Sequence, residues 1–240
     1  MKRISFIIYY LSFIIYYFIV SSAPAVAQPL MRDVFAAMPD SVLPMVTKNN
    51  RLDCIDFIEN NMQARVRNKV DSYVTLEALT ADYARFRTSD VSYMEMKLLP
   101  LDAVPSDSLG HNMILCVVTT VESGEADTER RIADSNIRIL NADWSSLPAD
   151  SPVNVTSIIQ QRDGDAFFAA APADSLRHAA AEARRSLISF HPVLVTLAPE
   201  DVTLTLTMQP GYLATEERKA IKDCLRPVTM RWNGRNFVAE

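Results

Sequence analysis

The stretch that decides the fold is residues 92–99, SYMEMKLL. Its odd-numbered positions carry Tyr93, Glu95 and Lys97, and its even-numbered positions 94, 96 and 98 are Met, Met and Leu. Successive side chains of a β-strand point to opposite faces of the sheet, so this pattern predicts a strand with one polar and one buried face. We therefore expect Glu95 and Lys97 on the solvent side of an antiparallel sheet.

Runs with the same period of two surround this strand, from residue 64 to residue 140, with polar turns between them. One run, MILCVV at residues 113–118, is apolar on both faces, which predicts a place inside the sheet with cover on both sides. The sequence therefore predicts an antiparallel meander. Its candidate strands are residues 64–69, 73–79, 83–88, 92–99, 113–121 and 131–140.

Two short helices are expected before the meander. MRDVFAAM at residues 31–38 ends where Pro39 stops a helix. A second helix starts at Asn49 or Asn50, because either side chain can cap it. A broad apolar stripe at period 3.6 indicates that this helix lies against the sheet. The stripe consists of Leu52, Ile55, Phe57, Ile58 and Met62.

The C-terminal part mixes helices and strands. Residues 173–187 have high helix propensity, and residues 215–225 form a second helix closed by Pro227. Residues 193–197 and 202–208 are predicted strands, and in the second the threonines at 203, 205 and 207 should face solvent. Asn233-Gly234 separates the runs 228–232 and 235–238, which predicts a terminal β-hairpin.

These elements predict an α+β fold of mainly antiparallel sheets, with helices packed on one face and a C-terminal β-hairpin. Residues 141–154 contain Pro148 and Pro152 and have the composition of a linker. We therefore expect two subdomains. The N-terminal one, residues 28–147, holds the helix pair and the meander, and the C-terminal α+β subdomain comprises residues 148–240.

Residues 1–27 have the three parts of a signal peptide. Lys2 and Arg3 precede an apolar run, and Ala25-Val26-Ala27 forms an A-x-A cleavage site. A membrane anchor is the alternative, because the apolar run approaches the length of a spanning helix. Cleavage after Ala27 removes 27 of the 240 residues and leaves 213. We expect an exported protein, periplasmic or associated with the cell surface, with no membrane span after cleavage.

Composition and motifs exclude several functions. A pI near 5.3 argues against nucleic acid as a partner. The three histidines, at 111, 178 and 191, have no evident catalytic partner, and no nucleophile elbow or zinc motif is present. Among five glycines no phosphate-binding loop occurs. We therefore predict no catalytic residues, no cofactor and no metal, and the short basic clusters at 65–67, 130–131 and 184–185 are interpreted as solvated faces.

The three cysteines, Cys54, Cys116 and Cys224, are too few and too dispersed for a disulfide framework. Free cysteine is commonly buried, so a structural thiol is the first interpretation for each of them. One disulfide among the three remains an alternative, because an oxidising compartment permits it.

Trp144 and Trp232 are the only tryptophans. Packing at a sheet edge or on a cross-strand neighbour is one interpretation for both. The other is a contact with a ligand or partner, such as a sugar or a protein. Carboxylates are plentiful, but a paired-carboxylate glycosidase site would also need an aromatic-lined cleft.

The segments MPDSVLPMVTKNNRLD at residues 38–53, RPV at 226–228 and RWNGRNFV at 231–238 resemble a family of exported proteins of unknown function from Gram-negative gut and oral anaerobes. This resemblance implies export and no reaction. Three Asp-Ser-apolar segments also resemble an O-glycosylation acceptor pattern of exported proteins in such bacteria. Turn or cap use is favoured at Ser41 and Ser175, and Ser108 stays a candidate acceptor.

Two functions follow from the sequence. The first is an exported binding or interaction protein whose partner is an envelope protein or a glycan. The alternative is a carboxylate-dependent hydrolase acting on envelope or glycan substrates, because catalytic residues need not be adjacent in sequence.

Overall fold

The computed structural model describes residues 30–101, 113–123, 130–151, 153, 167–168, 183, 186, 192–222 and 224–240. The expected signal peptide, the three histidines, Ser108 and Ser175 lie outside this part of the chain, as does most of the helix expected at residues 173–187. None of the described helices is long and apolar enough to cross a membrane.

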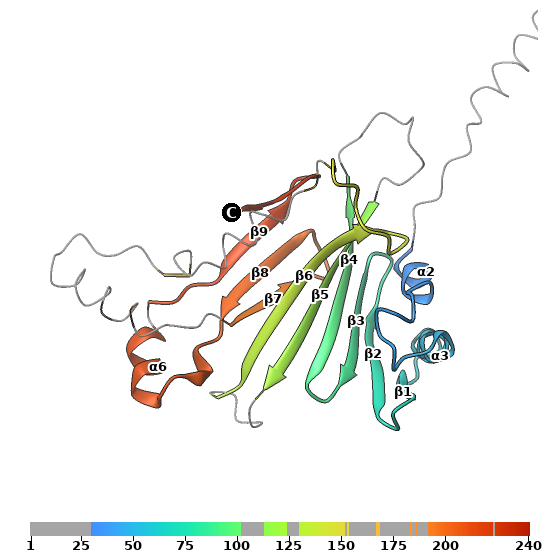
Figure 1. The fold of residues 1–240 in the computed structure, drawn as a ribbon, viewed down its shortest axis with the longest axis horizontal. Coiled ribbons are helices and arrows are strands. Elements are labelled where there is room, and N and C mark those ends of the chain that lie inside the picture. Colours follow the sequence, from blue (N-terminus) through green and yellow to red (C-terminus); the bar gives the residue numbers. More distant parts are fainter. Residues whose placement is uncertain are drawn as a thin grey trace, which may run out of the picture.

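The main sheet is an antiparallel meander of six strands in the order β1-β2-β3-β4-β5-β6, as the period-2 pattern predicts (Figure 1). β5 pairs with β4 on one side and β6 on the other, so the run MILCVV lies inside the sheet as predicted. The strands are β1 (Arg65–Arg67), β2 (Tyr73–Leu79), β3 (Tyr83–Ser89), β4 (Ser92–Pro100), β5 (Met113–Ser123) and β6 (Ile132–Asn141).

The second sheet has four antiparallel strands in the order β10-β9-β8-β7. In β8 the apolar side chains at 204, 206 and 208 are buried while the three threonines between them are half-buried, so the predicted alternation is present. Its strands are β7 (Val193–Leu197), β8 (Thr203–Met208), β9 (Val228–Trp232) and β10 (Phe237–Ala239). The 3-10 turn η2 (Pro210–Tyr212) and helix α6 (Thr215–Lys222) separate β8 from β9.

Two helices precede the sheets, α2 (Met31–Ala36) and α3 (Lys48–Glu59). The predicted cap of α3 was wrong by two or three residues, because Thr47 is the N-cap. Its hydroxyl accepts from the backbone N–H of Asn50 at 3.1 Å, and the Asn50 side chain accepts in return from the Thr47 N–H at 3.0 Å. This reciprocal capping box satisfies two N–H groups that the helix leaves free.

The main sheet buries both of its faces. On one face α2 and α3 pack against β2, β3 and β4, where the rings of Phe35 and Phe86 meet edge to face at 5.1 Å. On the other face β7, β8 and β9 pack over residues such as Ile114, Cys116 and Val118. The result is three layers, with the helix pair and the second sheet on opposite sides of the main sheet (Figure 1). The division expected near residue 148 falls between β6 and β7, and the two sheets share one core.

The predicted solvent face of β4 was wrong. Glu95 is 1% exposed and Lys97 is 2% exposed. The second sheet explains this burial, because β7 and the segment after it lie over this part of the main sheet. Lys97 Nζ donates to the carbonyl of Pro199 at 2.6 Å and forms an ion pair with Asp82 at 2.8 Å.

Strand β7 is joined to the main sheet by side chains that accept from its backbone. The N–H of Val193 donates to Asp134 at 3.1 Å and the N–H of Val195 donates to Ser135 at 3.0 Å. Burial raises the pKa of the Glu95 carboxyl, and the nearby backbone N–H of Leu197 opposes part of this rise. Two polar side chains of β6 therefore satisfy backbone N–H groups at the edge of the second sheet.

Candidate functional site: a charge chain on the main sheet

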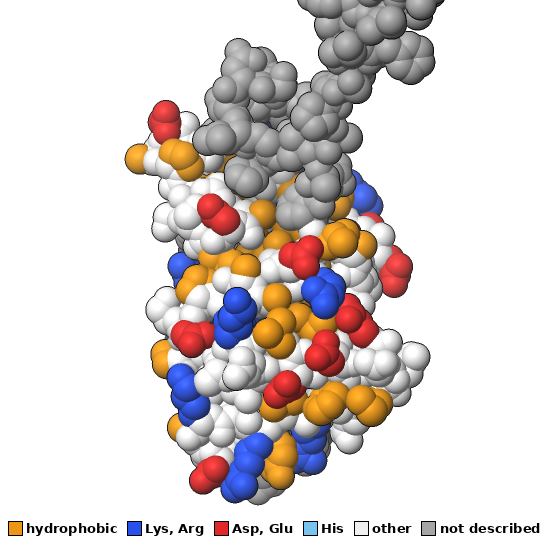
Figure 2. All heavy atoms as spheres, turned by 90° about the vertical axis from the view of Figure 1, so that its right-hand side faces the viewer, with side chains coloured by type: hydrophobic (Ala, Val, Ile, Leu, Met, Phe, Trp, Pro, Cys, Tyr) orange, Lys and Arg blue, Asp and Glu red, His pale blue; other side chains and the backbone are white. Residues whose placement is uncertain are grey.

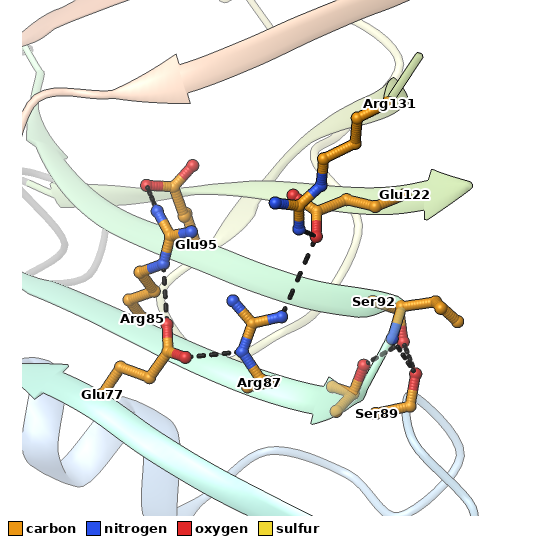
Figure 3. A network of polar contacts seen from close by, with 10 residues as sticks. Glu77, Arg85, Arg87, Ser89, Ser92, Glu95, Glu122 and Arg131 are labelled. Carbon is orange, nitrogen blue, oxygen red and sulfur yellow. Dashed lines mark hydrogen bonds and ion pairs between the residues drawn. The ribbon is translucent and has the colours of Figure 1, made fainter. Parts of the chain in front are cut away.

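Six charged side chains of alternating sign run across the face of the main sheet that looks toward the second sheet (Figure 3). They come from the neighbouring strands β2 to β5 and from the residue that precedes β6, and each one contacts the next. We call this row the charge chain, and its members in order are Glu95, Arg85, Glu77, Arg87, Glu122 and Arg131.

The first half of the chain centres on Glu77. Arg85 Nη1 lies 3.3 Å from Glu95 Oε1, and Arg85 Nε donates to Glu77 Oε2 at 2.9 Å. Arg87 Nε donates to the other oxygen, Glu77 Oε1, at 2.6 Å. One carboxylate thus holds two guanidinium groups that lie two residues apart on β3.

The second half of the chain centres on Glu122. Its Oε2 accepts a hydrogen bond from Arg131 Nη2 and lies 3.9 Å from Arg87 Nη1. Figure 3 shows the two arginines on either side of this carboxylate, Arg87 from β3 and Arg131 from the residue before β6. Arg131 immediately precedes β6, and its backbone is in close contact with η2, since a Cβ built on Gly211 would come within 2.7 Å of the Arg131 carbonyl oxygen.

A β-bulge places Glu77 in the chain. The register between β2 and β3 runs from Leu76 opposite Phe86 to Ala78 opposite Arg85, so Glu77 is the extra residue. Leu76 belongs to the core under the helices, whereas Ala78 packs on the core between the sheets. The bulge therefore reverses the facing of β2 and brings Glu77 beside Arg85 and Arg87.

A tyrosine ring supports the two arginines of β3. The Arg85 guanidinium carbon lies 4.1 Å from the centroid of the Tyr93 ring, and that of Arg87 lies 5.6 Å from it. Tyr93 itself is 3% exposed. Cation–π contacts and ion pairs together fix both guanidinium groups, which limits the rotamer entropy that they would lose on binding.

The chain runs from a buried end to an exposed end. Glu95 is buried, the side chains of Glu77, Arg85 and Arg87 are 28 to 30% exposed, and that of Arg131 is 47% exposed. Burial raises the pKa of the Glu95 carboxyl, although the hydrogen bond from the Tyr83 hydroxyl at 2.7 Å and the charge of Arg85 oppose this rise. Burial lowers the pKa of Arg85, but the carboxylates of Glu95 and Glu77 outweigh it and raise that pKa overall.

The two tryptophans lie elsewhere and are both buried. Trp144 Nε1 donates to the Val34 carbonyl of α2 at 2.8 Å, and Trp232 Nε1 donates to the Pro100 carbonyl of β4 at 2.6 Å. Each ring thus fastens an outer layer to the main sheet, and neither shows an open face to a ligand. The part of these tryptophans in ligand or partner contact stays a prediction.

Ser41, for which a turn or cap was favoured over O-glycosylation, lies in an exposed turn.

None of the three cysteines forms a disulfide. Cys54 lies in the core under the helices and Cys116 in the core between the sheets, so the main sheet separates them. Burial raises the pKa of Cys54 to about 12 and raises that of Cys116 as well, so both are protonated and unreactive at neutral pH. In the described part of the chain no three potential metal-ligating residues of the His, Cys, Asp or Glu type gather.

The charge chain contains no residue that the sequence alone selected as a site. The basic cluster at residues 130–131 was interpreted as a solvated face, and only Arg131 of that pair joins the chain. Two arginines at 85 and 87 and a glutamate at 95 are visible in the sequence. Their meeting with Glu77 depends on a bulge, and their meeting with Glu122 depends on pairing across three strands.

Other charged surfaces offer no comparable arrangement on the side of the molecule seen in Figure 2. There, basic and acidic side chains are interspersed with apolar ones over the helix pair and the neighbouring strands, and no patch of a single sign forms. The charge chain is therefore the candidate site.

Fold and site define a three-layer protein of mainly antiparallel sheet, with a fixed row of ion pairs on the inner face of its main sheet. The chain belongs to the family of proteins of unknown function DUF3256, whose profile matches residues 24–237. This confirms the resemblance noted in the sequence. A domain of an uncharacterized protein from Porphyromonas gingivalis W83 has a similar structure, with a TM-score of 0.64 and 26% identity over 89% of this chain and 99% of that one. No curated protein matches the sequence.

Proposed function

We propose that this protein is an exported binding or interaction protein, periplasmic or surface-associated, and that the charge chain contacts its partner. The scaffold proposed for this role is α+β, with helices on one face of the main sheet and a β-hairpin at the C-terminus. Export is supported by the signal-peptide pattern of residues 1–27.

The proposal is carried by two partly exposed arginines that are held in place but still have unused hydrogen-bond donors. Arg87 and Arg131 are each held by Glu122, and Arg87 also by Glu77 and the Tyr93 ring. Each arginine has five N–H donors. Within the described residues Arg87 and Arg131 each use only one of them in a hydrogen bond. Preorganised donors at a partly exposed position are typical of a recognition surface.

A photo-crosslinking experiment in the native host tests this location. Thr75 pairs with Arg87 across β2 and β3, so it lies on the same face and is half-buried. A benzophenone amino acid at Thr75 should give an adduct of defined mass, which should disappear when Arg87→Gln is added. The same probe at exposed Thr196 on β7 is the matched control. Identical adducts at both positions, or an adduct indifferent to Arg87→Gln, would refute the proposed surface.

A carboxylate-dependent hydrolase is the second candidate, and one observation favours it. Glu95 and Glu77 bind the same guanidinium group, and burial raises the pKa of Glu95 as a general acid would require. Against it, Glu95 is buried and both oxygens of Glu77 accept from arginines. Release of reducing ends from envelope polysaccharides, abolished by both Glu77→Gln and Glu95→Gln, would support the hydrolase. If the wild-type protein releases no reducing ends from any of these polysaccharides, the hydrolase is excluded.

A further inference from the structure

The hydrogen-bonding capacity left over in the charge chain indicates what kind of ligand it can accept. Every carboxylate of the chain already accepts from or pairs with an arginine. The arginines are not saturated in the same way. Arg85, Arg87 and Arg131 carry fifteen N–H groups by the usual count, and four hydrogen bonds to the carboxylates of the chain are formed. Glu95 Oε2 is the one buried carboxylate oxygen of the charge chain without a hydrogen-bond partner among the described residues, and it lies at the inner end. At the exposed end the surplus consists mainly of arginine donors, so a matching ligand must supply acceptors.

We propose that Arg87 and Arg131 together bind an oxyanion group of the ligand, a carboxylate or a phosphate. This proposal rests on the proposed function, because it assigns the ligand chemistry of the same surface. Guanidinium groups present two parallel N–H donors that match two oxygens of a carboxylate or phosphate. The two arginines already converge on one carboxylate of the protein, Glu122, and so demonstrate the geometry in which they receive such a group.

Glu122 is then an internal competitor for the ligand. Its side chain is 14% exposed, and its Oε2 occupies the position between the two guanidinium groups. The 3.9 Å separation from Arg87 Nη1 is longer than a hydrogen bond, so Arg87 Nη1 can donate to a ligand without breaking a hydrogen bond to Glu122. Removal of the Glu122 charge should therefore strengthen oxyanion binding, an effect that a purely structural ion pair would not give.

Calorimetric titration of the protein purified from its native host tests the site. The probes are a galacturonic acid trisaccharide and inorganic phosphate, with the neutral trisaccharide maltotriose as the control ligand. One of the two anionic probes should bind, and binding should weaken as salt is added. The probe that binds identifies the source of the oxyanion, carboxylate or phosphate.

Variants with matched controls make the test specific. Arg87→Gln and Arg131→Gln should each weaken binding about tenfold or more, because each removes charge-assisted hydrogen bonds. Arg87→Lys keeps the charge but loses the planar fork and should lie in between. Arg235→Gln changes an exposed arginine in the turn between β9 and β10 and should have no effect.

Glu122→Gln should tighten binding about two- to fivefold. Glu216→Gln removes an equal charge from a side chain that is 84% exposed on α6, and it should leave binding unchanged. Circular dichroism of each variant confirms that it is folded.

The proposal is overturned if neither anionic probe binds, if maltotriose binds equally well, or if Arg87→Gln and Arg235→Gln behave alike. An adduct at Thr75 without oxyanion binding would overturn only this ligand class and leave the proposed function standing. Oxyanion binding without an adduct at Thr75 would support the ligand class and overturn the proposed partner contact at this surface.

Discussion

Replacing Trp144 by phenylalanine should destabilise the protein more than the same replacement of Trp232. Both indoles are buried, and both N–H groups donate to a backbone carbonyl. The carbonyl that Trp144 satisfies belongs to Val34, which is buried within α2. In a continuing α-helix the N–H of Met38 would donate to this carbonyl, but it donates instead to the carbonyl of Phe35. Trp232 bonds to Pro100, an exposed residue at the end of β4.

The magnitude follows from this difference. Phenylalanine is smaller than tryptophan, so either variant loses on the order of 50 Å² of buried apolar area. This loss lowers the free energy of unfolding by about 1 kcal/mol. In Trp144→Phe the Val34 carbonyl remains buried without a partner, which costs about 1–3 kcal/mol. The total is roughly 2–4 kcal/mol of the free energy of unfolding. In Trp232→Phe water can replace the indole at Pro100, so the total should be about 1.5–2.5 kcal/mol.

Equilibrium unfolding in urea, followed by far-UV circular dichroism, measures both changes without depending on tryptophan fluorescence. Equal losses in the two variants, or a loss below about 1 kcal/mol for Trp144→Phe, would refute the reasoning from the orphaned carbonyl. A variant Trp144→Leu, which also lacks the N–H, should be at least as unstable as Trp144→Phe.

Three further predictions concern other elements. Gly211→Ala should cost about 1–3 kcal/mol in the same unfolding assay, because its Cβ would come within 2.7 Å of the backbone oxygen of Arg131; wild-type stability would disprove this close contact. Thr47→Ala should cost about 1 kcal/mol and Thr47→Ser much less, since serine keeps the cap; equal losses would mean that the hydroxyl does not cap α3. The Glu95 carboxyl has a raised pKa in the folded protein, so the folded state binds its proton more tightly than the unfolded state. The protonated carboxyl therefore contributes its full stabilisation below the ordinary glutamate pKa, and this contribution is lost as the pH rises through the raised pKa. Urea titrations at several pH values should show this fall in the free energy of unfolding for the wild type and not for Glu95→Gln.

The strands were predictable because their signal is local. A period of two in residues 193–197 survives whatever lies above the sheet, and the observed strand β7 has those bounds. The bounds of β2 also match the predicted residues 73–79. The facing of Glu95 and Lys97 was not predictable in the same way. The element that covers them, β7, lies about a hundred residues further along the chain, and nothing within β4 indicates its arrival.

The candidate site failed to emerge from the sequence for a related reason. Arg85 and Arg87 could be placed on one face of a strand, but their partners depend on register. The bulge at Glu77 changes that register by one residue, and a one-residue shift in a strand exchanges its two faces. The cap of α3 was not predicted because asparagine is as good a cap as threonine, and both Asn49 and Asn50 follow Thr47. Asn50 is instead the partner of Thr47 at the third helical position.

The side chains that accept from β7 also protect the protein from polymerising. A strand at the border of a sheet ordinarily offers unpaired N–H groups to another copy of the chain, which is a route to aggregation. In β7 the amides of Val193 and Val195 are already occupied by Asp134 and Ser135 of the same molecule. At the β1 border of the main sheet, the Asn50 side chain donates to the carbonyl of Arg67. These two sheet edges are therefore less available for pairing with other copies of the chain.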